Sequence, residues 1–215
     1  MSRLRPCIAE AVGTFALIFV GVGAIKAAGN DLLAVAFAHG LTIAVFVSAT
    51  MAVSGGHLNP AVTFGLLVGG KIRVGDAALY WISQLAGATL AAYACCWLLG
   101  RDAVAKGTPQ LASGVSIGQG MAVEGILTFF LVFVVFGTGV DPRGPKIGGL
   151  AIGLTIVLDI LFGGPLTGGA MNPARTFGPA LVAGVWDAHA VYWIGPLIGG
   201  AFAGWLYNTF LLKEA

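Results

Sequence analysis

The most informative residues of this 215-residue chain form one short phrase that occurs twice. Residues 54–65 read SGGHLNPAVTFG, and residues 167–178 read TGGAMNPARTFG. Asn is a favoured N-cap and Pro is favoured at the first helical position. Each copy therefore predicts a Gly-rich extended stretch that opens a helix at Asn59 or Asn172.

The two phrases can offer hydrogen-bond acceptors and donors in a fixed order. The predicted line of backbone carbonyl acceptors comes from Gly55, Gly56, His57, Gly168, Gly169 and Ala170. The amides of Asn59 and Asn172 supply donors where the copies meet, and each helix N-terminus adds roughly half a positive charge, which repels cations and protons. Such an array suits a file of small neutral polar molecules. Helix capping alone would explain one copy, but not two in register.

The composition excludes several classes of protein. Hydrophobic residues make up 58% of the chain, charged residues 9%, and the mean hydropathy is +0.93; soluble domains carry about 25% charged residues. The net charge of +2 is spread thinly, so we expect no nucleic-acid partner. No nucleophile, base or metal cluster is apparent, so we expect no enzyme, no metal and no cofactor. Cys7, Cys95 and Cys96 are interpreted as small buried side chains.

The elements that must position the phrases are membrane spans. Six are expected, at about residues 7–25, 32–53, 77–99, 117–140, 147–162 and 190–212. The two helices after the phrases are too short to cross a bilayer, which needs about 20 apolar residues. A polar stretch at 101–116 separates halves of about 1–105 and 115–215 within a single domain, 1–215.

The halves also match outside the phrases. Glu10 to Phe15 reads EAVGTF, and Glu124 to Phe129 reads EGILTF. Three spans per half is an odd number, so the halves must be inserted with opposite topology. The predicted fold is an all-α membrane protein with six transmembrane helices and two re-entrant half-helices in an inverted 3+3 repeat.

The positive charges predict the orientation, because Lys and Arg collect on the cytoplasmic side. One side would carry Arg3, Arg5, Lys71, Arg73, Arg143, Lys146 and Lys213, and the other Lys26, Arg101, Lys106 and Arg175. Both termini are therefore expected in the cytoplasm. The short termini favour a prokaryotic inner (plasma) membrane.

These features resemble the aquaporin and glycerol-facilitator family over essentially the whole chain. The resemblance implies a homotetramer surrounded by membrane lipids, with a passive pore for water in each protomer. The paired motif is Asn59, Pro60, Ala61 and Asn172, Pro173, Ala174. In the family the two asparagines donate to the permeant. Glu10 and Glu124 look like the family's buried carboxylates, which brace the half-helix loops.

In this family a four-residue constriction sets selectivity, and the matching positions here are His39, Ile160, Gly169 and Arg175. The set is similar to that of plant tonoplast intrinsic proteins that pass ammonia as well as water. The stretches LYWISQL from Leu79 and VYWIGPLIGG from Val191 are also tonoplast-like. That subgroup carries a further histidine in the third loop, whereas residues 101–116 contain none. Gly169 stands where mercury-sensitive members carry Cys, so we expect weak inhibition by mercury.

The sequence leaves two alternative functions and the roles of two residues undecided. A glycerol or small-polyol facilitator carries Asp after the arginine, where this chain has Thr176, and lines its constriction with two aromatics. A secondary transporter built on inverted repeats would need a coupling site near the midplane. Asp159 precedes Ile160 and is turned about 100° from it; it could contact His39, lie at the outer mouth or lie in a tetramer interface. His189, in a loop, is interpreted as solvated or interfacial.

Overall fold

The computed structural model describes residues 3–29 and 31–212, and every regular element in these ranges is helical. The long helices are α1 (Leu4–Ala28), α2 (Leu32–Ser54), α4 (Val74–Leu99), α6 (Ile117–Val135), α7 (Leu150–Thr167) and α9 (Val191–Leu206). The short ones are α3 (Pro60–Val68), α5 (Arg101–Gly107) and α8 (Pro173–Ala183), and the π turns η1 (Phe136–Val140) and η2 (Tyr207–Leu211) extend α6 and α9. Within the described part, five helices are long and apolar enough to cross a membrane: α1, α2, α4, α6 with η1, and α7. The last long helix, α9, has 16 residues and is continued by the π-helical turn η2.

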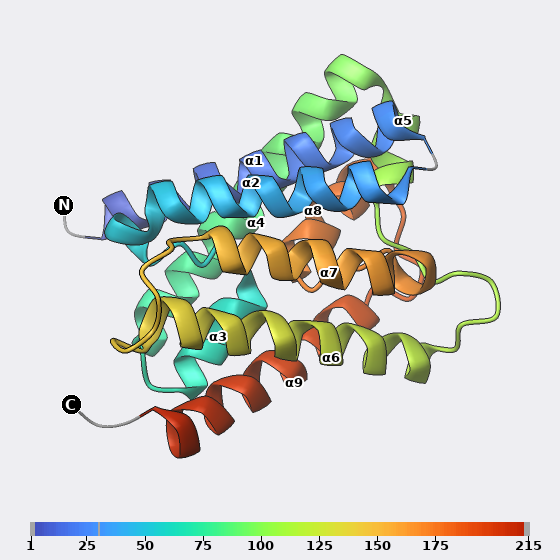
Figure 1. Cartoon of the computed structure of the whole chain (residues 1–215). Helices are drawn as coiled ribbons and strands as arrows, with labels where there is room; N and C mark the ends of the chain where they lie inside the picture. The colour runs from blue at the N-terminus through green and yellow to red at the C-terminus, as the bar shows by residue number, and fades with distance from the viewer. Residues whose placement is uncertain (1–2, 30, 213–215) are drawn as a thin grey trace.

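The helix packing is nearly unchanged when the two halves are exchanged. In the first half α1 packs on α4 and α2, and in the second α6 packs on α9 and α7. The short helices cross over, so that α3 packs on α9 and α8 packs on α4, while α2 packs on α7 between the halves. The long helices run in alternating directions across the bundle (Figure 1). This is the arrangement predicted from the inverted repeat.

Close contact between paired helices depends on glycine. A Cβ on Gly199 of α9 would overlap the carbonyl oxygen of Gly125 on α6. In the other half, a Cβ on Gly87 of α4 would overlap the carbonyl oxygen of Ala11 on α1. Small residues at such positions let two backbones approach closely without a large apolar driving force.

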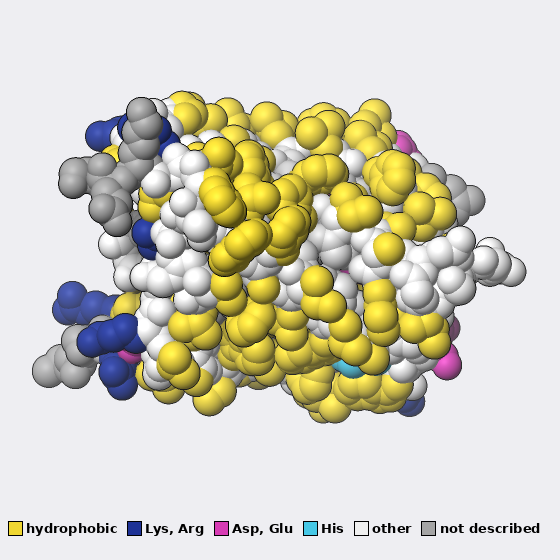
Figure 2. All heavy atoms as spheres, turned by 90° about the horizontal axis from the view of Figure 1, so that it is seen from below, with side chains coloured by type: hydrophobic (Ala, Val, Ile, Leu, Met, Phe, Trp, Pro, Cys, Tyr) yellow, Lys and Arg dark blue, Asp and Glu magenta, His cyan; other side chains and the backbone are white. Residues whose placement is uncertain are grey.

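The outside of the bundle is apolar and its ends are charged. Many large apolar side chains on the long helices are exposed, among them Leu158 at 67% and Phe162 at 65%. Hydrophobic side chains cover most of the face in Figure 2, and Lys and Arg gather mainly at one end. The first turn of α1 and the last turn of α9 lie at that end (Figure 1).

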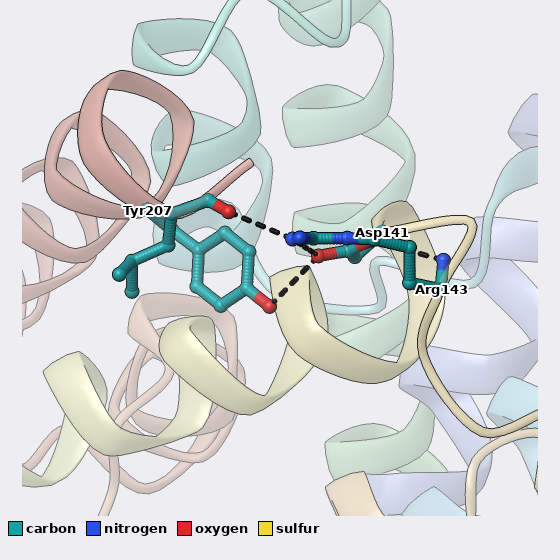
Figure 3. Close-up of polar contacts among 4 residues, drawn as sticks. Asp141, Arg143 and Tyr207 are labelled. Atoms are coloured by element: carbon teal, nitrogen blue, oxygen red, sulfur yellow. Dashed lines mark hydrogen bonds and ion pairs between the residues drawn. The ribbon is translucent and has the colours of Figure 1, made fainter. Parts of the chain in front are cut away.

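Polar contacts tie the chain together at the same end. Arg3 pairs with Asp76 on α4 at 3.0 Å. The Arg143 side chain bonds the Asp141 carboxylate and donates to the Leu211 carbonyl at 2.7 Å, and the Tyr207 hydroxyl donates to Asp141 at 3.2 Å (Figure 3). Six of the seven basic residues predicted for this side lie in the described chain, and Lys213 lies outside it.

The structure differs from the sequence prediction in one additional helix and in the bounds of one span. The polar stretch 101–116 contains a helix, α5, which was not predicted. Its Ala103 and Val104 are buried, and its Arg101 donates to the Ala183 carbonyl at the end of α8. The fifth span is Leu150–Thr167 instead of 147–162.

The later start and end of α7 have local causes. Gly148 has φ +58°, which is incompatible with a helix beginning at Ile147. At the other end, the predicted boundary lies just before Gly163-Gly164-Pro165, a sequence that favours the end of a helix. Pro165 is instead tolerated inside α7, and the helix ends on Gly168 in the left-handed conformation.

Candidate functional site

The two phrases form loops with matching backbone conformations. Gly55 and Gly168 both end long helices with positive φ, at 89° and 84°. Leu58 and Met171, the residues before the two asparagines, both have positive φ as well, at 52° and 50°. Positive φ is uncommon for residues other than glycine, so the surrounding contacts must hold these loops in place.

Each asparagine caps its own half-helix and also bonds the opposite loop. The Asn59 side-chain oxygen accepts from Ala61 N at 2.8 Å, and Asn172 accepts from Ala174 N at 3.0 Å. The Asn59 Nδ2 donates to Met171 O at 2.8 Å, and the Asn172 Nδ2 donates to Leu58 O at 3.0 Å. A side-chain amide has two N–H donors, so one remains on each asparagine.

The two predicted glutamates lie fully buried behind these loops. Glu10 accepts hydrogen bonds from the Ser54 hydroxyl, the His57 and Leu58 backbone and the Gln84 amide, at 2.6 to 2.9 Å. Glu124 accepts from the Thr167 hydroxyl and from the Ala170 and Met171 backbone, also at 2.6 to 2.9 Å. Carboxylates can accept several bonds at once, so each glutamate fixes the backbone of one loop.

Two tyrosines that the sequence analysis missed hold the starts of the loops. The Tyr80 hydroxyl donates to Ser54 O, and the Tyr192 hydroxyl donates to Thr167 O, both at 2.8 Å. Both tyrosines are buried. The tripeptide Tyr-Trp-Ile begins at both positions and could have identified the pair as a further repeat.

A narrow cavity passes between the loops. Its volume is about 30 Å³, small beside the 300–1,000 Å³ typical of ligand pockets. Its polar wall is formed by His39, Gly56, His57, Asn59, Gly169, Ala170, Asn172 and Arg175. Its apolar wall includes Leu17, Ile43, Val47, Val62, Leu131, Val135, Ile152, Ile156 and Ile160.

The structure brings together most of the predicted site. All four constriction residues and both asparagines line this cavity. Of the predicted carbonyl line, Gly56, His57, Gly169 and Ala170 belong to it. Gly168 instead lines an outer vestibule of about 490 Å³ that shares Ile160 and Arg175 with the cavity. Gly55 does not line the cavity. The Pro-Ala pairs form the buried first turns of α3 and α8.

His39 is seated against a glycine of α1. Its Nδ1 lies 2.9 Å from Val35 O, which assigns that nitrogen as the donor and leaves Nε2 as an acceptor. A Cβ on Gly21 would overlap the Nε2 end of the ring. Gly21 therefore makes the space that keeps His39 at the edge of the cavity.

Arg175 is held through α5, the helix missed from the sequence. Its side chain is 6% exposed, and its Nη1 donates to Gly107 O at 3.5 Å. The Nε–H has no hydrogen-bond partner within the described chain. Lys106 lines the outer vestibule together with Arg175, so the outer approach to the cavity is positively charged.

Asp159 and His189 lie outside the cavity. Asp159 is 3% exposed and lines a different hollow, between α6 and α7. His189 is half-buried, and its Nε2 accepts from the Trp193 ring N–H at 3.1 Å, while burial lowers its pKa. Over residues 3–29 and 31–212, no cluster of three potential metal ligands occurs.

Known proteins share this architecture. The family description "Major intrinsic protein" matches residues 1–207. Aquaporin TIP4-4 of Zea mays is 47% identical over 98% of this chain and 88% of the relative. Aquaporin TIP4-1 of Arabidopsis thaliana is 49% identical, with 98% and 88% covered. The X-ray structure of the aquaglyceroporin from Plasmodium falciparum superposes with a TM-score of 0.86 at 25% identity, covering 97% of each chain. The chain therefore belongs to the major intrinsic protein family.

Proposed function

We propose that this protein is a passive channel in which water moves in single file between the two asparagine loops, with ammonia as a second permeant. The observation that carries the proposal is that His39, Ile160, Gly169 and Arg175 line the same narrow cavity as both motif asparagines. The asparagines each keep one free N–H for the permeant's oxygen or nitrogen. The aquaporin relatives support water as the main permeant.

The composition of the constriction supports ammonia. His39 offers one polar acceptor, Ile160 an apolar wall, and Gly169 no side chain at all. A neutral molecule that is less strongly hydrated than water meets a smaller desolvation cost on such a wall. The family's ammonia-conducting pattern has a further histidine in the third loop. Here that loop instead supplies Gly107 O as the acceptor for Arg175.

Exclusion of ions and protons follows from three fixed sources of positive potential. The N-termini of α3 and α8 both begin at the asparagines that line the cavity, and Arg175 adds a full charge at the outer side. Each helix end contributes roughly half a charge. A cation would lose its hydration in a pore whose walls repel it.

The glycerol alternative has less support. A cavity of about 30 Å³ is narrow for a three-carbon polyol, and the constriction has no aromatic pair to cradle a carbon backbone. The similarity to an aquaglyceroporin structure at 25% identity does not outweigh relatives named as aquaporins at 47% and 49%. A secondary transporter would need Glu10 or Glu124 to bind a coupling ion. Both carboxylates are occupied by loop donors.

The channel is an integral membrane protein. We propose that both termini lie in the cytoplasm and that the protein forms a homotetramer, as the family resemblance implies. The gathering of Lys and Arg at the end where α1 begins and α9 ends supports this orientation (Figure 2). The two aquaporins reported above come from plants, so they give no support to the prokaryotic inner membrane expected from the short termini.

The test is stopped-flow spectroscopy on proteoliposomes. Osmotic shrinkage reports water permeability, and internal alkalinisation reports ammonia entry. Wild type is compared with His39→Phe, and His189→Phe serves as the matched control because this histidine lies outside the cavity. We expect wild type to exceed empty liposomes in both assays, and His39→Phe to reduce ammonia entry more than water flow.

Two results would overturn parts of the proposal. If wild type raises water permeability alone, ammonia is not a permeant. If neither permeability exceeds that of empty liposomes, the cavity is not an open channel.

A further inference from the structure

The outer vestibule combines positive charge with an apolar wall. It has a volume of about 490 Å³ and lies at the end of the bundle opposite the two termini, between the end of α1, the start of α2, α5 and the end of α7 (Figure 1). Its side-chain donors are Lys106, Gln110 and Arg175. Its apolar part comes from Ile25, Leu32, Val35, Pro109, Ile160 and Pro165. No Asp or Glu of the described chain lines it.

The Arg175 guanidinium has spare donors at this wall. It carries five N–H groups, and within the described chain its side chain makes one hydrogen bond, from Nη1 to Gly107 O. That bond is 3.5 Å long, beyond the usual range of about 2.7–3.2 Å. The buried Nε–H has no partner there. A buried charged group that lacks partners is costly, so Arg175 favours a ligand that brings acceptor oxygens.

The two positive charges of the vestibule have no acid beside them in the described chain. Lys106 is exposed and forms no ion pair there. Glu124 lies behind the neighbouring loop, where it accepts from Ala170 N and Met171 N, and it does not line the vestibule. The N-termini of α3 and α8 add positive potential from the pore side. The potential that repels cations therefore attracts anions to the same mouth.

An anion held at Arg175 cannot move deeper into the pore. The cavity beyond has a volume of only about 30 Å³, and one of its walls is apolar. Its polar wall includes Gly56, His57 and Ala170 of the carbonyl line, whose oxygens repel negative charge. The anion would lose its hydration there without a replacement. It therefore stops in the path that water takes.

The apolar part of the vestibule selects the kind of anion. A carboxylate can accept two parallel N–H···O bonds from one guanidinium. Phosphate and sulfate carry oxygens on every side, so some would face Ile25 or Pro165 without a donor. A monocarboxylate with a compact apolar group can place its charge at Arg175 and Lys106 and its apolar part against that wall.

We propose, on the basis of the water channel described above, that the outer vestibule is a regulatory site for monocarboxylates that carry a compact apolar group, and that the bound anion blocks water flow. Arg175 and Lys106 bind the carboxylate, and the exposed Gln110 amide adds a donor. The apolar group packs against the residues at the ends of α1 and α7.

The experiment measures osmotic shrinkage of proteoliposomes at pH 7.5 with benzoate as the probe. Benzoate is present at equal concentration on both sides, so it creates no osmotic gradient, and sucrose drives the shrinkage. Benzamide is the neutral probe of the same shape. Wild type is compared with Lys106→Gln. Lys26→Gln is the matched control, because Lys26 is an exposed lysine in the last turn of α1 that does not line the vestibule. Empty liposomes with each probe give the background.

We expect benzoate to lower the water permeability of wild type and Lys26→Gln at concentrations where benzamide has no effect. Lys106→Gln should need about threefold more benzoate for half inhibition, the size expected when one partly exposed ion pair is lost. Each variant is scaled to its own rate without benzoate. Equal inhibition by benzamide, unchanged benzoate sensitivity in Lys106→Gln, or the same loss of sensitivity in Lys26→Gln would each overturn the proposal.

A binding measurement separates this site from the channel function. Saturation-transfer NMR of benzoate with the purified full-length protein in lipid nanodiscs reports binding whether or not water flows. If water permeability without benzoate equals that of empty liposomes, the proposed function fails, and weaker benzoate binding by Lys106→Gln than by Lys26→Gln would still support the site. If wild type conducts water but neither binds benzoate nor is inhibited by it, the vestibule site is wrong and the channel stands.

Discussion

The carboxylates of Glu10 and Glu124 hold the backbone conformation of the two pore loops. Glu10 alone receives four donors from three different segments of the chain, and Glu124 receives three. These bonds hold Leu58 and Met171 at positive φ and leave their carbonyls facing the opposite asparagine. The geometry of the pore centre therefore depends on groups that do not line it.

Glu10→Gln should destabilise the fold and reduce water permeability. A glutamine can accept on only one of the two side-chain atoms, so some of the four donors lose their partner. Each buried donor left unpaired costs about 1–3 kcal/mol. We expect a lower thermal unfolding midpoint in detergent and slower osmotic shrinkage. Asp31→Asn is the control, because Asp31 caps the exposed start of α2 and Asn caps equally well. An unchanged midpoint for Glu10→Gln would contradict this role.

Gly21→Ala should narrow the channel although Gly21 itself does not line the cavity. The new Cβ would overlap the His39 ring, which must then turn into the cavity. Gly23→Ala is the control on the same helix, because no heavy atom lies within 4 Å of a Cβ there. We expect water permeability to fall in the first variant and to stay at the wild-type level in the second. Equal water permeabilities of the two variants would show that the His39 ring can move away from the new Cβ without entering the cavity.

The long helices could be predicted from the sequence. Their ends, and the short helix that supports them, could be predicted less well. Apolar length gave six spans and the Asn-Pro pairs gave the starts of α3 and α8, because these depend on local chemistry. α5 was missed because its helix is short and depends on tertiary contacts through Val104 and Arg101. The end of α7 was missed because packing, here of Gly163 against Leu127, overrides the local effect of Gly-Gly-Pro.

The site residues also divide into those that could be predicted from the sequence and those that could not. His39, Ile160, Gly169 and Arg175 were assigned through the resemblance to the family's constriction, and they share one cavity. Tyr80, Tyr192 and Gln84 were not found, because their roles rest on bonds to residues far away in the sequence. Asp159 was singled out, but a helix rotation of about 100° could not say which hollow it faces.

At the scale of helix pairs, Gly199→Ala should weaken the packing of α9 on α6 and destabilise the fold. The Cβ would meet a backbone oxygen, which cannot turn aside as a side chain can. Overpacking of this kind costs about 1–3 kcal/mol. Gly118→Ala on α6 has open space and should be neutral or slightly stabilising, since alanine favours helix. Thermal unfolding midpoints measure both. A midpoint for Gly199→Ala at or above that of Gly118→Ala would contradict close packing at this crossing.

For the whole molecule, ionic contacts join segments that lie far apart in the sequence at the end that carries the first turn of α1 and the C-terminal end of α9. Asp141 follows η1, and through Arg143 and Tyr207 it joins the loop before α7 to η2, the π-helical turn after α9 (Figure 3). Hydrogen bonds from the Arg143 side chain, and then from its backbone N–H, hold the pKa of Asp141 well below its ordinary value of 3.8.

This lowered pKa predicts how stability depends on pH. A carboxyl with a lower pKa in the folded state stabilises the fold fully above its unfolded pKa, and this contribution is lost as pH falls through the folded value. Wild type should therefore be more stable than Asp141→Asn at pH 7, by an amount that stays constant down to about pH 5 and shrinks below about pH 4. Thermal unfolding of both proteins from pH 7 to pH 3 measures the difference. A gap that persists undiminished at pH 3 would mean that the Asp141 carboxylate is not what ties the loop to α9.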